Sequence, residues 1–468
     1  MKRIFTMILF ICLSVSSFAQ TYFDTSLHAT RAGKSTAYAK ENGGMELITG
    51  IPMKDLACLK CHSTTEKLPD GSAINSATYA PSCNDCHNFA AGLWVEQETC
   101  LNCHNRQVYE QQMYPDADPN GDVHRKRGMK CMDCHRQSEM HGENKVYSSW
   151  LDDGASKTSC TQAACHPLSV LSSNTSHDVH AKNGKVDCLA CHTTSIVSCT
   201  NCHFETLIAT GKNRAMKKIK GFELLIKRDG KITSGTFMTF TYNGKSNVII
   251  APFRSHLIQK NARTCTDCHV NMGGNVASIK EYNADAKITM TKWSETGKTV
   301  STPTGVVPIP ADWKTSLKFD FATYDGDVNN AAVTDPTKWR YITSTVNNIH
   351  MFHAEPLDNA TLLKLGFSRI PTAVKESNEL PMEFSLSQNY PNPFNPTTNI
   401  KFSLPKGSHV TLSVYDVLGK IVATLVNEDK SAGTYEVDFN ASKLSSGIYF
   451  YQIVTPNYSA TKKLLLMK

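Results

Sequence analysis

The chain has 468 residues, with 49 basic and 42 acidic side chains and a formal net charge of +7. This length allows more than one domain, and so small a basic excess does not indicate a nucleic-acid partner. Basic runs such as residues 217–220 (KKIK) are typical of a solvated face. We therefore expect no nucleic-acid binding.

The first 19 residues have the pattern of a secretory signal peptide. Two basic residues precede an apolar run over residues 4–15, and small residues before Gln20 fit a cleavage site. Cys12 would be removed with the signal. No later apolar stretch approaches the roughly 20 residues that a membrane helix needs. The sequence therefore predicts an exported chain without an integral membrane span, which passes through the periplasm to the cell surface or the extracellular space.

A cysteine motif dominates the rest of the sequence. Cys-X-X-Cys-His occurs seven times and Cys-X4-Cys-His once, and together they use every cysteine after the predicted signal. The eight motifs, in chain order, are Cys58, Cys61 and His62; Cys83, Cys86 and His87; Cys100, Cys103 and His104; Cys131, Cys134 and His135; Cys160, Cys165 and His166; Cys188, Cys191 and His192; Cys199, Cys202 and His203; and Cys265, Cys268 and His269.

Each motif is typical of a haem c attachment site. Two thiols at this spacing form thioethers with the vinyl groups at one porphyrin edge, and the adjacent imidazole reaches the iron as the proximal ligand. A single Cys-X-X-Cys could also be a redox pair, half of a zinc site or two disulfide partners. None of these explains a histidine after the second cysteine in all eight motifs. We predict eight covalently bound haem c groups, whose propionates bring the charge to about neutral. The two extra residues of the fifth motif can bulge outward.

Function depends on the second axial position of each iron, because a haem with ligands on both faces transfers electrons whereas an open face can bind a substrate. Eight histidines outside the motifs are available for the eight irons. We predict that these are the distal ligands, although each could instead bond a haem propionate at the surface. Met140 and Met272 are weaker thioether alternatives, and His409 lies in the C-terminal region. The eight candidates are His28, His124, His141, His177, His180, His256, His350 and His353.

Some of these histidines recur in one context. His124, His180 and His256 each lie seven to nine residues before a motif, and the first two are preceded by Asp-Val. This repeat favours them as ligands. His177 and His180 are three residues apart and would share a helical face, so one could bind iron while the other bonds a propionate.

The haem-bearing part is predicted to span residues 20–370 and to be mainly α-helical and irregular, because haems would replace much of the apolar core. Within it, residues 221–252 alternate between apolar and polar, with turn signals at 229–230 and 243–244. This pattern predicts a small antiparallel β meander. Residues 270–370 lack cysteine, and we expect them to pack back over the haems.

A polar linker over residues 371–383 leads to residues 384–468, where alternating strands predict an all-β Ig-like sandwich. This part opens with NYPNPFNPTT, has VYDVLGK at its centre and SSGIYFY in a later strand, and ends in TKKLLLMK. It closely resembles the C-terminal sorting domain of type IX secretion cargo. The resemblance implies transport across an outer membrane by that machinery, with the passenger released or fixed at the cell surface. An ordinary Ig-like carbohydrate-binding module is the alternative.

Other stretches carry a second resemblance. They are the run from His124 to His141 with its GMKCMDCH core, the segment APFRSH that ends at His256, and the short sequences PADW and EPL further on. Over residues 25–370 the chain resembles octahaem cytochromes related to tetrathionate reductase and, more distantly, to hydroxylamine oxidoreductase and pentahaem nitrite reductase. In the reductase branch one haem has lysine as its proximal ligand, whereas every motif here ends in histidine. The resemblance therefore does not carry catalysis over.

Three functions remain open at this point. The first is an electron-transfer cytochrome with a chain of bis-histidine haems, working between a redox partner in the cell envelope and an external acceptor. The second is an oxidoreductase acting on a small nitrogen or sulfur compound, such as nitrite, hydroxylamine or tetrathionate, at one open haem, for example that of the fifth motif. The third is a subunit of a polymeric wire in which a neighbour donates a distal histidine.

Overall fold

The protein divides into two compact units, Met1–Thr372 and Ala373–Lys468, which we describe separately. The predicted signal (1–19), the first motif and the predicted linker (371–383) lie outside the described residues. No helix of the described chain is long and apolar enough to cross a membrane. The structure, a computed structural model, describes residues 22–52, 68–73, 80–143, 145–150, 152, 154–156, 158–161, 165–167, 176–182, 184–203, 217–326, 335–369, 384–405, 407–430 and 433–467.

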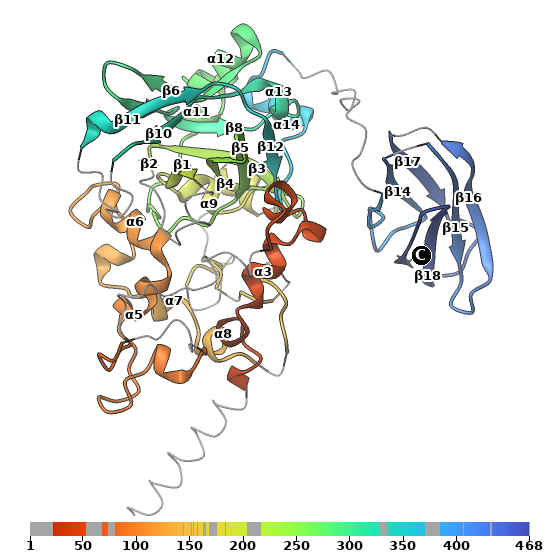
Figure 1. Cartoon of the computed structure of the whole chain (residues 1–468), viewed down its shortest axis with the longest axis horizontal. Helices are drawn as coiled ribbons and strands as arrows, with labels where there is room; N and C mark the ends of the chain where they lie inside the picture. The colour runs from red at the N-terminus through yellow and green to blue at the C-terminus, as the bar shows by residue number, and fades with distance from the viewer. Residues whose placement is uncertain are drawn as a thin grey trace, which may run out of the picture. The chain divides into compact units, whose positions relative to one another are not determined.

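Short helices carry most of the motifs, as the sequence pattern predicts (Figure 1). Among the described helices that contain motif cysteines, the longest is α5, with seven residues. The helical elements are α2 (Leu27–Thr30), α3 (Ala32–Tyr38), η1 (Lys40–Asn42), α4 (Glu46–Thr49), η4 (Cys83–Asp85), α5 (Gln97–Cys103), α6 (Asn105–Met113), η5 (Arg125–Arg127), α7 (Cys131–Cys134), α8 (Gln137–His141), the π-helical turn η7 (His177–Ala181) and α9 (Leu189–His192).

An aspartate inside the motif fixes the turn in two of these elements and in α11 (Cys265–Cys268). In the second, fourth and eighth motifs the residue before the second cysteine is aspartate, and its carboxylate accepts the backbone N–H that precedes the turn. Asp133 accepts from Lys130 N at 2.6 Å, and Asp267 accepts from Thr264 N at 2.6 Å. Such capping holds both cysteines of a motif on one helical turn.

A seven-stranded sheet forms the second layer of the first unit. Its order is β12-β5-β4-β1-β2, and β3 pairs with both β4 and β8. Both hairpin turns of the predicted meander have two residues with positive φ, Asp229-Gly230 and Asn243-Gly244, as type I′ turns require. The strands are β1 (Ser198–His203), β2 (Lys217–Ile219), β3 (Phe222–Arg228), β4 (Lys231–Tyr242), β5 (Lys245–Pro252), β8 (Gly305–Pro308) and β12 (Asn348–Met351).

The segment 270–370 packs on the sheet, since Trp313 and Phe319 belong to one buried cluster with Phe222 and Phe237 of the meander. Its apolar content supplies a core of its own, and the β portion is larger than a small insertion. Its expected packing over the haems stays a prediction. The segment contains η8 (Val270–Met272), α12 (Ala277–Asp285), β6 (Ile288–Ser294), β7 (Thr299–Ser301), α13 (Trp313–Ser316), β9 (Leu317–Phe319), β10 (Phe321–Tyr324), η9 (Pro336–Lys338), β11 (Trp339–Thr343) and α14 (Asn359–Leu365).

The second unit consists of two antiparallel sheets, β13-β14-β17 and β16-β15-β18-β19. Inward-facing residues of both sheets, including Phe402, Leu412 and Tyr451, form one fully buried cluster. Two facing sheets around a shared core form a β-sandwich arrangement. The strands are β13 (Ser385–Leu386), β14 (Thr397–Leu404), β15 (Ser408–Tyr415), β16 (Ile421–Lys430), β17 (Gly433–Asn440), β18 (Gly447–Thr455) and β19 (Tyr458–Leu466).

Candidate functional site

Six motif histidines each face one of the histidines from outside the motifs. The ring centroids of the six pairs lie 5.9–6.4 Å apart. The partners come from segments that are remote in sequence in most cases. The pairs are His104 with His28, His87 with His141, His166 with His124, His135 with His256, His192 with His177 and His269 with His180.

The spacing of these pairs fits one metal ion between two imidazoles. A metal–imidazole nitrogen bond is about 2 Å long and the ring nitrogen lies about 1 Å from the centroid, so two rings on opposite sides of one metal have centroids about 6 Å apart. Ordinary aromatic pairs have centroids about 4.5–7 Å apart, so the distance alone is not decisive. The distinguishing feature is that all six pairs join one motif histidine to one other histidine at nearly the same distance. The residues therefore fit an iron porphyrin that is held from both faces.

The outer nitrogens of several rings are tied to backbone carbonyls. Nδ1–H of His87 donates to Leu93 O at 3.1 Å, and that of His192 donates to Gln259 O at 3.0 Å. His269 donates to Lys364 O at 2.6 Å and His180 to Ser176 O at 3.1 Å. Hydrogen bonds of this kind fix the tautomer of a metal-ligating histidine and orient Nε2 toward the metal.

Three other rings lie beside buried carboxylates. His135 Nδ1 donates to Glu139 Oε2 at 2.9 Å. His256 Nδ1 lies 3.7 Å from Glu110 Oε2, and His124 Nδ1 lies 3.9 Å from Asp122 Oδ2. Burial lowers the pKa of His256, but Glu110 and Asp122 together raise it above its ordinary value.

Two rings are kept neutral by their surroundings. Burial, followed by the Arg31 guanidinium, lowers the pKa of His28, although its ring is hydrogen bonded to the backbone carbonyl of Glu139. Burial and the neighbouring His87 lower the pKa of His141, whose Nδ1 lies 3.1 Å from the Gln137 amide nitrogen. The neutral imidazole is the form that binds a metal.

The π-helical turn η7 presents two rings to two different motifs. His177 faces His192 and His180 faces His269. Their spacing in sequence allows one of these histidines to bind iron and the other a propionate, whereas in the structure both face a motif histidine. The wider turn of a π-helix spreads the two side chains, which an α-helical face would hold together.

Cysteines of neighbouring motifs contact one another. The side chains of Cys100 and Cys131 lie close together, and so do those of Cys160 and Cys188. These contacts join the third motif to the fourth and the fifth to the sixth.

The structure describes less of the first and seventh motifs than of the others. Cys58, Cys61 and His62 of the first motif lie outside the described residues. In the seventh motif, Cys202 and His203 belong to strand β1, where the Cys202 backbone pairs with Phe240 of β4, but their side chains lie outside the described part of the structure. The predicted haem attachment through Cys61 and Cys202 is therefore untested and stays a prediction.

The seventh motif also differs from the others in its backbone. Its first cysteine, Cys199, is buried in the sheet, whereas the motif cysteines on the short helices are partly or fully exposed. The register of β1 against β4 shifts between Cys199 and Cys202. An extended segment with such an irregularity can turn two cysteines toward one side, so a strand does not exclude attachment at this motif.

His350 and His353 are placed differently from the other candidates. His350 Nε2 contacts the carbonyl of Gly43, and His353 Nε2 donates to Ala37 O at 2.9 Å. Both rings thus hold residues 37–43, the chain that leads to the first motif. Because the side chains of His62 and His203 lie outside the described residues, the structure does not test a pairing with either of them.

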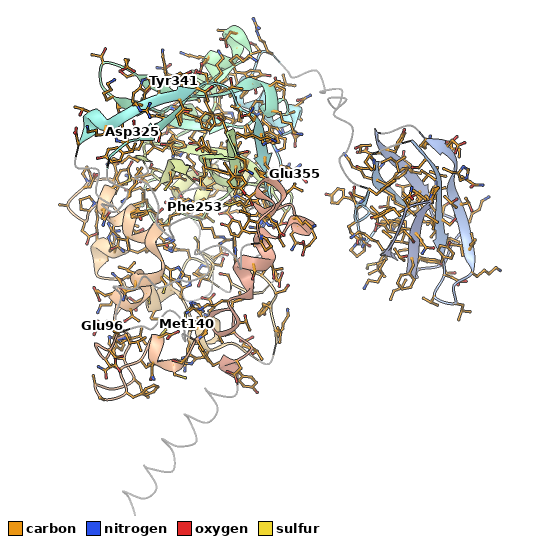
Figure 2. All side chains as sticks on the ribbon, in the orientation of Figure 1. Glu96, Met140, Phe253, Asp325, Tyr341 and Glu355 are labelled. Atoms are coloured by element: carbon orange, nitrogen blue, oxygen red, sulfur yellow. The ribbon has the colours of Figure 1, made fainter. Side chains whose placement is uncertain are left out.

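The thioether alternatives receive no geometric support among the described residues. Met272 is 58 % exposed, and Met140, labelled in Figure 2, lies on α8 one residue before His141.

The two glutamates at the fourth motif were not singled out from the sequence. Glu139 follows His135 by four residues, a spacing that could have revealed it. Glu110 is 146 residues from His256, and no local signal connects them.

Two family matches cover separate parts of the chain. Residues 388–467 match the family described as secretion system C-terminal sorting domain, and residues 46–109 match cytochrome c7 and related cytochrome c. The chain therefore contains a cytochrome c7-like multihaem domain, a family that implies covalently bound haem c, and a sorting domain. The sorting domain indicates export to the cell surface or extracellular space and interaction with the secretion machinery.

Two solved structures show short similarities to the chain. Dimeric latent PorU from Porphyromonas gingivalis is 16 % identical with a TM-score of 0.16, covering 18 % of this chain and 9 % of that one. PorZ, an essential surface component of the type IX secretion system of the same bacterium, is 18 % identical with a TM-score of 0.14, covering 20 % and 13 %. The similarity thus spans only a small part of those proteins. No curated protein matches the chain.

Proposed function

We propose that this protein is an exported octahaem cytochrome that carries electrons between a redox partner in the cell envelope and an external acceptor. The observation that carries the proposal is the set of six histidine pairs at 5.9–6.4 Å. A haem held by two histidines supplies one-electron transfer and offers no open position to a substrate. The relationship to the tetrathionate reductase-like octahaem family and the Ig-like class of the second unit belong to this proposal.

The cysteines suggest the order in which the sites follow one another. Beyond the contacts of the third motif with the fourth and the fifth with the sixth, the cysteines of three further pairs lie near one another. These pairs join the second motif to the third, the fourth to the fifth and the sixth to the eighth; they are Cys86–Cys100, Cys134–Cys165 and Cys191–Cys268. The chain's own residues would thus hold the sites of the second, third, fourth, fifth, sixth and eighth motifs in one uninterrupted row.

His350 and His353 are the remaining candidates for the first and seventh motifs. Burial lowers the pKa of both rings, which keeps them in the neutral form that a metal needs. To bind iron, the two rings would have to give up the hydrogen bonds of Nε2 to the carbonyls of Gly43 and Ala37. Their assignment therefore rests on the equal numbers of histidines and motifs.

The hydrogen bonds of His350 and His353 favour an oxidoreductase as a second candidate function. If both rings keep their carbonyl partners, the first and the seventh haem would each have an open face for a small nitrogen or sulfur compound. The fifth motif is a poorer choice, because the His124 ring lies 6.3 Å from His166. A polymeric wire is less favoured, because the six pairs are formed within one chain.

Low-temperature EPR of the purified full-length protein distinguishes the two functions. Electron transfer alone predicts low-spin ferric signals throughout and no change with nitrite, hydroxylamine or cyanide. A high-spin signal that shifts with one of these compounds would favour the oxidoreductase. The intact mass, with eight haems added to the mature chain, tests the number of cofactors in the same sample.

A further inference from the structure

The fourth motif lies between two buried carboxylates. On one side, Nδ1–H of His135 donates to Glu139 Oε2 at 2.9 Å. On the other side, Nδ1 of His256, whose ring faces His135, lies 3.7 Å from Glu110 Oε2. The Glu139 side chain is 5 % exposed and that of Glu110 is 1 % exposed. Both imidazoles of this pair thus have a negative charge at their outer nitrogen, shielded from water.

Each carboxylate is held in place by other donors. Glu110 Oε1 accepts from Ser255 Oγ at 2.6 Å, and Glu110 Oε2 accepts from His256 N at 3.1 Å. Glu139 Oε1 accepts from Thr158 N at 2.7 Å. Charge-assisted hydrogen bonds of this kind are the strong ones. The two side chains are therefore positioned by the fold, and do not depend on the imidazoles to stay where they are.

The other pairs with identified partners have weaker or neutral acceptors. In the eighth pair, His269 and His180 both donate to backbone carbonyls. In the second and sixth pairs, one ring of each does the same. The fifth pair has a carboxylate near one ring, with Asp122 3.9 Å from His124. Among the rings whose acceptors are identified, negative charge at the outer nitrogens is therefore greatest at the fourth motif and next greatest at the fifth. The Glu139 carboxylate also acts more weakly on His28 of the third pair.

Negative charge at this position has a defined effect on a ligated metal. A carboxylate that accepts the Nδ1 proton makes the imidazole a stronger donor. In a buried site it also stabilises the more positive, ferric state over the ferrous state, because screening by water is weak there. Both effects lower the reduction potential.

We propose that Glu110 and Glu139 are positioning residues that give the fourth-motif haem the lowest reduction potential of the six sites with described histidine pairs. The proposal rests on the proposed function, because it needs a haem at this pair. It places the minimum of reduction potential along the row at the fourth motif.

The test is a redox titration of the full-length holoprotein, followed by EPR of the individual low-spin ferric signals. Glu110→Gln and Glu139→Gln keep the size of each side chain and remove its charge. Each variant should move the lowest-potential component to a more positive potential, and the double variant should move it further than either single one. The ferric EPR signal of that same component should change its g-values.

Two further variants serve as controls. Glu281→Gln removes a carboxylate that accepts from Thr289 N at 2.9 Å on the β side of the unit, and it should leave the lowest component where it is. Glu110→Asp retains the charge and should shift this component less than Glu110→Gln. A merely structural role of Glu110 would not produce this difference.

The proposal is wrong if either glutamine variant, with its full haem content by mass, leaves the lowest component unmoved or moves a different one. If one variant fails to incorporate haem, the other decides. Failure of the proposed function would look different, because the wild-type protein itself would then lack thioether-bound haem or show a high-spin ferric signal.

Discussion

The two layers of the first unit are stabilised in different ways. In the sheet layer, Phe222, Phe237 and Ile250 are fully buried in one apolar cluster. In the motif-bearing layer, helices α5 and α7 bury none of their residues, while paired imidazoles and neighbouring cysteines lie between the helices. The sheet can form from apolar side chains alone, whereas the helices need a cofactor to pack against.

The largest expected effect is the loss of the helical layer when haem cannot be attached. Protein produced without haem should lose hydrogen-exchange protection over residues 97–141, because these short helices are not stable in isolation. Residues 222–252 should stay protected by their own core. Hydrogen exchange followed by mass spectrometry measures both regions in one sample. Equal protection in both regions, with or without haem, would refute the comparison.

Truncation in the sheet core should have the next largest effect. Phe237 is fully buried, and its ring contacts those of Phe222 and Phe319. Phe237→Ala should lower the free energy of unfolding by about 3–5 kcal/mol, measured by denaturant unfolding. The visible spectrum of the folded protein should not change. Tyr341→Ala, at a side chain that is 43 % exposed, is the control and should cost less than about 0.5 kcal/mol.

The contact between the two layers includes a hydrogen bond from the Ser255 hydroxyl, and the free energy of unfolding should depend on it. Ser255 Oγ donates to the buried carboxylate of Glu110 at 2.6 Å. Ser255→Ala leaves that carboxylate without one donor and should cost about 1–3 kcal/mol of unfolding free energy. The exposed Ser301→Ala, which removes a 3.3 Å bond to Lys292 O, should have almost no effect. Equal decreases in the free energy of unfolding of the two variants would show that the Ser255–Glu110 hydrogen bond has no special role.

The smallest expected effect concerns a hairpin turn of the sheet. Gly244 has φ +67, and an added Cβ would meet no atom within 4 Å. Gly244→Ala should therefore cost only the backbone strain of the left-handed conformation, about 1–2 kcal/mol. Thermal unfolding measures it as a small decrease in Tm. A loss as large as that of Phe237→Ala would mean that the turn makes contacts absent from the structure.

The sequence was a good guide to what is local. The meander follows from apolar alternation and two turn dipeptides, and both turns have the positive φ values that Asp-Gly and Asn-Gly favour. The histidines were identified as ligand candidates by type and number and, for His124, His180 and His256, by their recurring position ahead of a motif. The extent of the β layer was underestimated, because residues 270–370 contain short strands that become regular only by pairing with remote partners. The same pairing places Cys202 on a strand, which its motif alone does not indicate.

The pairing of the histidines was beyond local reasoning. His124, His180 and His256 each precede a motif closely, yet each ring faces a histidine of a different one, namely His166, His269 and His135. A proximal and a distal ligand lie on opposite faces of a porphyrin, and a short connection cannot pass around its edge. Most pairs therefore form between remote segments, which sequence spacing does not reveal, whereas His177 faces His192 of the motif that follows it.

The central claim is that each of the six histidine pairs holds one iron. X-ray diffraction from crystals of the holoprotein, with anomalous data collected at the iron absorption edge, tests it most directly. The account predicts an iron peak midway between the rings of every pair, from His28 with His104 to His180 with His269. Iron peaks that lie away from these pairs, or pairs without an iron between them, would contradict it.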